Sequence, residues 1–569
     1  MHINVIPNRG AAPTILLRES FRDGTKVCKR TLANLSALSA AQVQMIRGAL
    51  RGDVLQPVEK TFEVIDSPAH GHVQAVFLAM QRLGFASVLG SKPSRERDLV
   101  LAMVASRIIC PATKLATTRL WGVSTLAQEF GVNGADEDEL YAAMDWLLAG
   151  QDRIQKKLAA RHLKQDSLVL YDLSSSYFEG VQCPLAKLGY SRDGKRGTLQ
   201  VNYGLLTDDR GCPVAISVYE GNTSDSTTFV PQVKRLREEF GIHSMVMVGD
   251  RGMISQKAID EMSKDTDVAW ITALRSSSIR TLVEQGHLQM GLFDERNLLE
   301  ISSPDFPGER LVACRNPELA KLRVHTRNDL LLATEKELEK IKLRVESAKL
   351  VGKDKIGVAA GKVVNRYKVS KHFELTITDD AFTFARLQDN IAAEAALDGL
   401  YIIRTSVKPE RMDAPTCVRT YKSLAQVERA FRSIKTMDLK VRPIHHYLES
   451  RVRAHIFLCM LAYYVEWHMR EVWRELLFAD EDQAAAKLVR DPVAPATRSD
   501  AAMKKALSRT LEDGSPVHSY ATLMAELATI VRNTCRTPGG AVDAPTFEII
   551  TTPNQTQQRA LELIAQIKP

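Results

Sequence analysis

Short apolar runs alternate with amphipathic stretches between residues 167 and 275, and this alternation constrains the fold more than any other feature. The order is an apolar run (SLVLYDL), two runs around a turn at 208–211, a helical stretch, a run (SMVMVGDRG), another helical stretch and a last run (VAWITAL). Short apolar runs bounded by turn residues are typical of strands, and longer periodic stretches are typical of helices. The pattern predicts three antiparallel strands, a helix and two further strands in a mixed α/β sheet.

The chain of 569 residues is too long for one hydrophobic core and predicts several domains. A hairpin is indicated by the Asp23-Gly24 pair between two alternating segments. Residues 124–148 contain two helical stretches around glycines, a pattern that favours a helix-turn-helix but is also common in helical bundles. The expected regions are a β-hairpin and linker (1–70), a helical DNA-binding region (71–165), the sheet in two parts (166–275 and 396–478), an inserted subdomain (276–395) and a helical C-terminal tail (479–569).

Several classes of protein find no support in the sequence. The longest apolar run, residues 456–465, is too short to cross a bilayer and predicts a buried helix. The first ten residues lack a basic region followed by an apolar stretch, so we expect neither a secretory signal nor a membrane partner. The eight cysteines include no CxxC pair, which argues against zinc ribbons and disulfide scaffolds and favours free thiols in the cytoplasm. No GxxxxGK[ST], HExxH or GxSxG motif occurs.

Basic residues are concentrated between residues 419 and 453, where nine Lys or Arg stand against three acids. Such a cluster suits a polyanion such as nucleic acid, and a solvated helical face would explain it equally well. Residues 421–435 (YKSLAQVERAFRSIK) read as one amphipathic helix. Its apolar stripe predicts docking on the sheet and consists of Val427, Phe431 and Ile434.

Three acids form a candidate metal site. Asp172 and Asp250 each end an apolar strand, where α/β sheets bind ligands, although either could simply cap the next turn. Glu428 would share a helical face with Tyr421 and Lys435, each seven residues away. Three converging carboxylates repel one another unless cations intervene, and hard oxygen ligands in that number favour Mg²⁺ or Mn²⁺. Two such ions about 3.5–4 Å apart suit in-line phosphoryl transfer.

These residues carry a resemblance to a known family. The chain resembles the DDE transposases of bacterial insertion sequences, in the group with an inserted subdomain and a Y-x2-R-x3-E-x6-K signature. That signature reads Tyr421, Leu424, Glu428 and Lys435, with leucine replacing the arginine. The other similar motifs, which extend the resemblance over residues 14–470, are FRDGTK, YDLSSSYFEG, LGYSRDGKRGTLQVNYGLL, YEGNTSDSTTF, VGDRGMIS and RPIHHYLESRVRAHIFLCMLAYYV.

The resemblance implies a ribonuclease-H-like catalytic core that uses two divalent ions, Mg²⁺ or Mn²⁺. It assigns Asp172, Asp250 and Glu428 to the catalytic, metal-binding triad. It also places Tyr421 and Lys435 on DNA near the cleaved end.

Four further basic residues are candidates for DNA contacts. Arg429 and Arg432 follow the predicted catalytic glutamate on the same helix and would hold the phosphodiester backbone. Lys195 and Arg196 lie in a loop before the second strand, where a backbone contact competes with a simple solvated loop.

We therefore expect a transposase that cuts at the ends of an insertion sequence and joins the freed 3′-hydroxyl to target DNA. Its partners would be double-stranded terminal inverted repeats, target DNA and a second copy of the chain. It would act in a bacterial cytoplasm, at the nucleoid. The alternatives are a metal-dependent nuclease that cuts without joining and a DNA-binding regulator that has lost catalysis.

Overall fold

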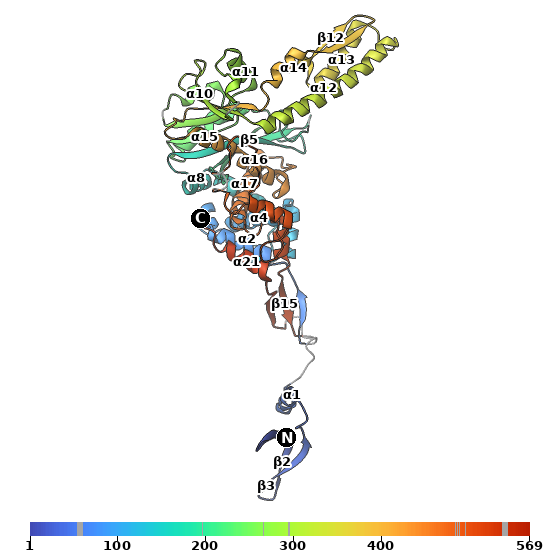
Figure 1. Ribbon diagram of the computed structural model, residues 1–569. Helices are drawn as coiled ribbons and strands as arrows, with labels where there is room; N and C mark the ends of the chain where they lie inside the picture. The colour runs from blue at the N-terminus through green and yellow to red at the C-terminus, as the bar shows by residue number, and fades with distance from the viewer. Residues whose placement is uncertain are drawn as a thin grey trace. The chain divides into compact units, whose positions relative to one another are not determined.

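The computed structural model describes residues 1–569 except for 54–60, 196, 266, 294–295, 484, 486–487, 489, 496, 538–543 and 569. The chain forms two compact units, which Figure 1 draws as ribbons. The smaller unit comprises Met1–Pro68 and Val531–Thr552, and the larger unit comprises Ala69–Ile530 and Pro553–Pro569.

The smaller unit contains two antiparallel sheets. The predicted hairpin turn is confirmed, because it joins β2 to β3 and Gly24 has a φ of +60° there. The second sheet pairs β4 with β15, and Ser67 Oγ donates to Asn533 Oδ1, 466 positions later. The elements of this unit are β1 (His2–Asn8), β2 (Ala11–Asp23), β3 (Lys26–Asn34), α1 (Ala40–Arg51), β4 (Glu63–Asp66), β15 (Arg532–Arg536) and β16 (Thr546–Ile550).

The C-terminal tail is therefore helical only in part, and the expectation of a helical region at 479–569 was wrong for the strands Arg532–Arg536 and Thr546–Ile550. Two strands of five residues each are too short to show a clear alternation, and their partner strand lies near the other end of the sequence. The tail's helices are α19 (Asp500–Ser508), α20 (Tyr520–Ala528) and α21 (Gln555–Ile564).

The larger unit begins with a bundle of helices. Ser94 caps α4, and its hydroxyl accepts a hydrogen bond from the Arg97 amide at 3.2 Å. The chain between α6 and α7 turns at Gly131 and Gly134, both with positive φ. The elements of the bundle are α2 (Gly71–Arg82), α3 (Phe85–Leu89), α4 (Arg95–Ile109), α5 (Lys114–Leu120), η2 (Trp121–Val123), α6 (Leu126–Glu129), α7 (Glu137–Ala149) and α8 (Gln151–His162).

An eight-stranded sheet follows the bundle, in the order β10-β11-β14-β9-β8-β5-β6-β7. β8 runs parallel to β5 and β9, whereas the other neighbours are antiparallel, so the predicted mixed α/β sheet is confirmed. Helix α9 (Asp225–Glu238) joins β7 to β8, and α10 (Gln256–Met262) joins β8 to β9. The strands are β5 (Ser167–Tyr177), β6 (Gln200–Thr207), β7 (Pro213–Glu220), β8 (Met245–Val248), β9 (Val268–Ala273), β10 (Leu298–Ile301), β11 (Arg310–Arg315) and β14 (Leu400–Thr405).

The segment between β9 and β14 is divided between this sheet and a separate hydrophobic cluster. β14 lies inside the sheet, because β11 pairs with it and β10 pairs with β11. The second part packs its own apolar residues, including Leu331, Leu338 and Phe373. The elements of the segment besides β10 and β11 are α11 (Ser276–Glu284), η3 (Met290–Phe293), α12 (Pro317–Glu346), α13 (Lys353–Tyr367), η4 (Ser370–His372), β12 (Phe373–Ile377), β13 (Phe382–Arg386) and α14 (Gln388–Ala395).

The chain then forms α15 (Ala414–Lys422), α16 (Leu424–Arg432), the π-turn η5 (Ser433–Met437) and α17 (Glu449–Val472). Every residue from 456 to 465 is buried, so α17 is the buried helix that the sequence predicts. In the described part of the chain, no single helix is long and apolar enough to cross a membrane; α4 with α5 and η2 reaches that length only across a bend of 87°.

Candidate active site

The sheet places Asp172 and Asp250 at the same level. Leu170 of β5 is the parallel partner of Val248 of β8, and each aspartate follows its strand's paired residue by two positions. Asp250 lies just beyond the end of β8, as the sequence predicts. Asp172 does not end its strand, because β6 stays paired with β5 as far as Tyr177. The pairing of β5 with β8 ends before Asp172, at Leu170.

Glu428 reaches the site from α16, and the prediction of one continuous helix over residues 421–435 was wrong. Ser423 separates α15 from α16, and η5 begins at Ser433. The Ser423 hydroxyl donates to the Thr420 carbonyl at 2.6 Å, a local bond that competes with regular helix geometry. Tyr421, Glu428 and Lys435 therefore belong to three successive elements.

The predicted apolar stripe docks α16 on the sheet. Val427, Phe431 and Ile434 are all buried, and the Phe431 ring lies 5.7 Å from the Tyr203 ring of β6. Packing of this face leaves Glu428 exposed beside β5.

The carboxyl group of Asp172 is electrostatically coupled to both other acids. Burial and the negative charges of Asp250 and Glu428 raise the pKa of Asp172 to about 7. The Leu173 amide, which donates to the carboxylate at 2.8 Å, and the Arg192 cation oppose this by lowering the pKa. Like charges raise the pKa of an acid only when they are close to it. The fold thus brings the three predicted acids, distant in sequence, into one electrostatic neighbourhood.

The donor atoms of these acids suit divalent cations. Carboxylate oxygens are the hard ligands that Mg²⁺ and Mn²⁺ prefer, and a cation would relieve the repulsion that raises the pKa of Asp172. Among the described residues, the ligand atoms of the three acids do not form a set within 4.8 Å of one another.

Tyr421 contacts a predicted catalytic acid in this structure. Its hydroxyl donates to Asp250 Oδ1 at 3.2 Å. Burial, followed by the charge of Asp250, raises the pKa of Tyr421, so the phenol stays protonated and remains a donor at neutral pH. The resemblance places Tyr421 on DNA, whereas the structure places it where it orients Asp250.

Lys435 is buried in an ion pair. Its Nζ lies 2.9 Å from Asp193 Oδ1, and the two side chains are 10% and 2% exposed. Arg442 also pairs with Asp193, whose other oxygen accepts from the Tyr177 amide at 3.1 Å. The two cations hold the pKa of Asp193 below its usual range although burial opposes them. Lys435 thus ties η5 to the loop between β5 and β6.

Comparison with known proteins identifies the family. The sequence model of the transposase DDE domain matches residues 165–465, more than half of the chain, and includes Asp172, Asp250 and Glu428. The chain belongs to the DDE transposase family.

A structure of the piggyBac transposase synaptic complex with hairpin DNA is similar to this transposase over 80% of this chain and 78% of that one, with 8% sequence identity and a TM-score of 0.34. No curated protein sequence matches the transposase.

The remaining predicted DNA contacts of the transposase are Arg429, Arg432, Lys195 and Arg196. Arg429 and Arg432 are exposed on α16. Lys195 is exposed, and its Nζ lies 3.5 Å from the centre of the Tyr177 ring at the end of β5. Arg196 lies outside the described residues. Their contacts with DNA stay predictions.

Arg192 belongs to the site, and the sequence analysis gave it no role. Its backbone N–H donates to Ser175 Oγ at 3.1 Å, and its side chain pairs with Asp225. Its charge lowers the pKa of Asp172, so it lies close enough to stabilise that carboxylate. Its position in the LGYSRDGKRG motif was the available signal, since that motif is similar to the family.

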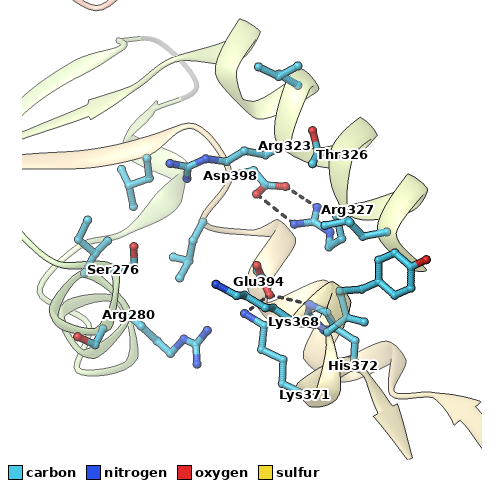
Figure 2. A pocket seen from close by; sticks show the side chains of 18 of the residues that line it. Ser276, Arg280, Arg323, Thr326, Arg327, Lys368, Lys371, His372, Glu394 and Asp398 are labelled. Atoms are coloured by element: carbon cyan, nitrogen blue, oxygen red, sulfur yellow. Dashed lines mark hydrogen bonds and ion pairs between the residues drawn. The ribbon is translucent and has the colours of Figure 1, made fainter. Parts of the chain in front are cut away.

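A basic cavity of about 760 Å³ lies between α11, α12 and α14 (Figure 2). Its wall includes Arg251, which directly follows Asp250. Two of its cations are paired inside the cavity, Arg327 with Asp398 at 3.1 Å and Lys371 with Glu394 at 2.6 Å. In the described ranges no ion-pair partner is found for the other four Lys and Arg residues, Arg251, Arg280, Arg323 and Lys368. The cavity therefore carries a net positive charge, and one of its cations belongs to the residue that follows Asp250.

Proposed function

We propose that this transposase cuts double-stranded DNA at the ends of an insertion sequence and joins those ends to target DNA, using Mg²⁺ or Mn²⁺ and acting as a pair of copies. The observation that carries the proposal is the electrostatic coupling of Asp172 to Glu428 of α16 and to Asp250, which lies at the same level of the sheet as Asp172. The strand order β7-β6-β5-β8-β9 supports a ribonuclease-H-like core, since its three antiparallel strands precede two parallel ones.

The two reactions use the same site. In the first, the oxygen of water joins phosphorus at the element's end and the 3′-oxygen leaves as a hydroxyl. In the second, that hydroxyl joins a phosphorus of the target and displaces the target's own 3′-oxygen. Divalent ions held by Asp172, Asp250 and Glu428 would neutralise charge on the attacking and leaving oxygens.

Neighbouring side chains set the positions and charges of these acids. The Tyr421 hydroxyl orients Asp250 by donating to its carboxylate. Arg192 stabilises the charged form of Asp172, which is the form that binds a cation. The ion pairs of Asp193 hold the loop that contains Arg192 against η5.

A strand-transfer assay tests the proposal. A labelled duplex that ends in a pre-cut inverted repeat with a free 3′-hydroxyl is incubated with Mg²⁺, the transposase and a plasmid target. Covalent joining of the label to the plasmid is the expected result. Cleavage of an uncut end without joining would favour the nuclease alternative, and binding with neither reaction would favour the regulator.

Removing two cations of the basic cavity, by Arg280→Ala with Arg323→Ala, should weaken binding of DNA that extends past the cleaved end. Each phosphate contact contributes about 0.9 to the slope of log K against log salt, so the double variant should lose roughly 2 units of slope. Fluorescence anisotropy titrations over a range of salt concentrations measure this slope.

The matched control is Lys336→Ala with Lys362→Ala, two exposed cations on α12 and α13 that do not line the cavity. Their slope should stay near that of the wild type. An equal loss of slope in both double variants would show that general charge, and not the cavity, governs the binding.

A further inference from the structure

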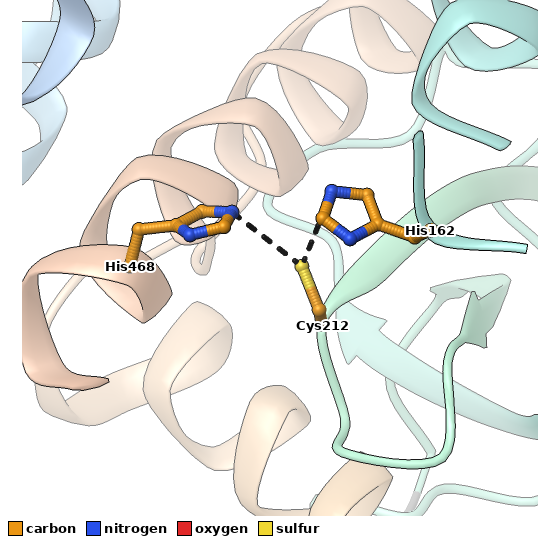
Figure 3. Close-up of side chains that lie close together, drawn as sticks. All are labelled: His162, Cys212 and His468. Carbon is orange, nitrogen blue, oxygen red and sulfur yellow. Dashed lines mark hydrogen bonds between the residues drawn. The ribbon is translucent and has the colours of Figure 1, made fainter. Parts of the chain in front are cut away.

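His162, Cys212 and His468 converge at one point (Figure 3), and none of them is one of the three predicted catalytic acids. The Cys212 sulfur lies 3.9 Å from His162 Nε2 and 3.8 Å from His468 Nε2, and all three ligand atoms lie within 4.8 Å of one another. In a tetrahedral zinc site, the usual bond lengths place sulfur about 3.6 Å from each nitrogen. A shift of a few tenths of an ångström would bring both pairs to that separation.

Each of the three side chains comes from a different element. His162 is the last residue of α8, and His468 lies on α17. Cys212 is held by a turn that Asp208 organises, because the Asp208 carboxylate accepts from the Cys212 amide at 2.8 Å and from the Arg210 amide at 3.0 Å. The turn thus holds the thiol toward the two rings.

We propose that His162, Cys212 and His468 bind one Zn²⁺ ion, which fixes the 208–212 turn to α8 and α17. Two imidazoles and a thiolate form a donor set that favours zinc over magnesium or calcium. A fourth position would be left for water or another ligand, as at zinc sites with three protein ligands. Binding exchanges the thiol proton for the metal, so one proton is released for each ion bound.

The surroundings are compatible with such an ion. Burial is the main cause that lowers the pKa of His162 to about 4 and that of His468 to about 3, so both rings are neutral near pH 7. Burial raises the pKa of Cys212, and a bound cation would reverse that effect by stabilising the thiolate. The nearby Arg210 cation is engaged by the Asp208 carboxylate, with Nε to Oδ2 at 3.0 Å.

Zinc in this cluster would also brace a wall of the catalytic site. Gly211, which precedes Cys212, has a φ of +87°, and a Cβ placed on it would lie 2.7 Å from the Cβ of Gln426. The turn therefore abuts α16 two residues before Glu428. An ion that fixes the turn would restrict the movement of α16 at this point.

Metal analysis of the full chain without a polyhistidine tag tests the proposal. We expect about one zinc per chain by mass spectrometry. The zinc should be lost in Cys212→Ala and retained in the control Cys459→Ala, which removes a buried thiol on α17 that is not part of the cluster. Asp250→Ala should retain the zinc, which separates this cluster from the catalytic acids and keeps the result independent of DNA chemistry.

Cobalt substitution of the wild-type chain gives a second readout that does not need a folded variant. Co²⁺ should produce a thiolate-to-cobalt charge-transfer band that Zn²⁺ abolishes by displacement, and a chelator should lower the thermal midpoint. Folded wild-type protein that takes up Co²⁺ without this band, or takes up none, would overturn the proposal, as would Cys212→Ala that folds and retains its zinc.

Discussion

Asp250→Ala is expected to reduce Mg²⁺-dependent cleavage of an element end by about 10³-fold or more. A catalytic metal contributes several kcal/mol of transition-state stabilisation, and each 1.36 kcal/mol corresponds to a factor of ten in rate. The variant removes a carboxylate that couples to Asp172 and anchors the Tyr421 hydroxyl. Single-turnover cleavage of a labelled duplex measures the effect.

The control for this experiment is Asp260→Ala, which removes an exposed acid from α10, the next helix along the chain. That variant should cleave at the wild-type rate, and both variants should bind the end as tightly as the wild type does. Cleavage by Asp250→Ala at an undiminished rate would remove this residue from the catalytic site.

Asp193→Ala should lower the free energy of unfolding by about 3–5 kcal/mol, more than any other single substitution proposed for this chain. Asp193 is 2% exposed and compensates both Lys435 and Arg442, and a buried ion pair that loses one partner leaves uncompensated charge behind. Urea unfolding of the larger unit, followed by tryptophan fluorescence, gives the difference from the wild type.

A double variant checks whether Lys435 acts through this ion pair. Asp193→Ala combined with Lys435→Met should recover part of the lost stability, because the second change removes one of the two orphaned charges. If Asp193→Ala instead keeps full stability, Lys435 is not held by the pair and is available to contact DNA.

The sequence predicts those parts of the fold that depend on local pattern. The alternation in residues 167–275 predicts the strands and helices of the central sheet because a strand buried on both faces is a short apolar run. The stripe of Val427, Phe431 and Ile434 predicts which face of α16 is buried, since that face repeats with helical period.

Features that depend on contacts distant in sequence could not be predicted in this way. β10 and β11 extend the sheet beyond β14 through backbone pairing that leaves no compositional mark. The interruption at Ser423 depends on a single side-chain hydrogen bond inside an otherwise regular helical pattern.

The candidate site shows the same division. Asp172 and Asp250 are recognisable because each acid follows an apolar run. The partner of Lys435 cannot be recognised from the sequence, because Asp193 lies 242 positions away. The zinc ligands are equally hidden, since 50 and 256 positions separate Cys212 from the two histidines and no spacing rule covers such intervals.

The pairing of β4 with β15 fixes an order of assembly during translation. The two strands leave the ribosome more than 400 residues apart, since Ser67 and Asn533 are 466 positions from each other. At about 5–20 residues per second this interval lasts roughly 20–90 s. Among the described residues β15 is the one strand that pairs with β4, so β4 lacks that partner until β15 emerges, and the whole eight-stranded sheet is synthesised within this interval. The smaller unit thus cannot close until residues 531–552 have been synthesised, after all of the eight-stranded sheet.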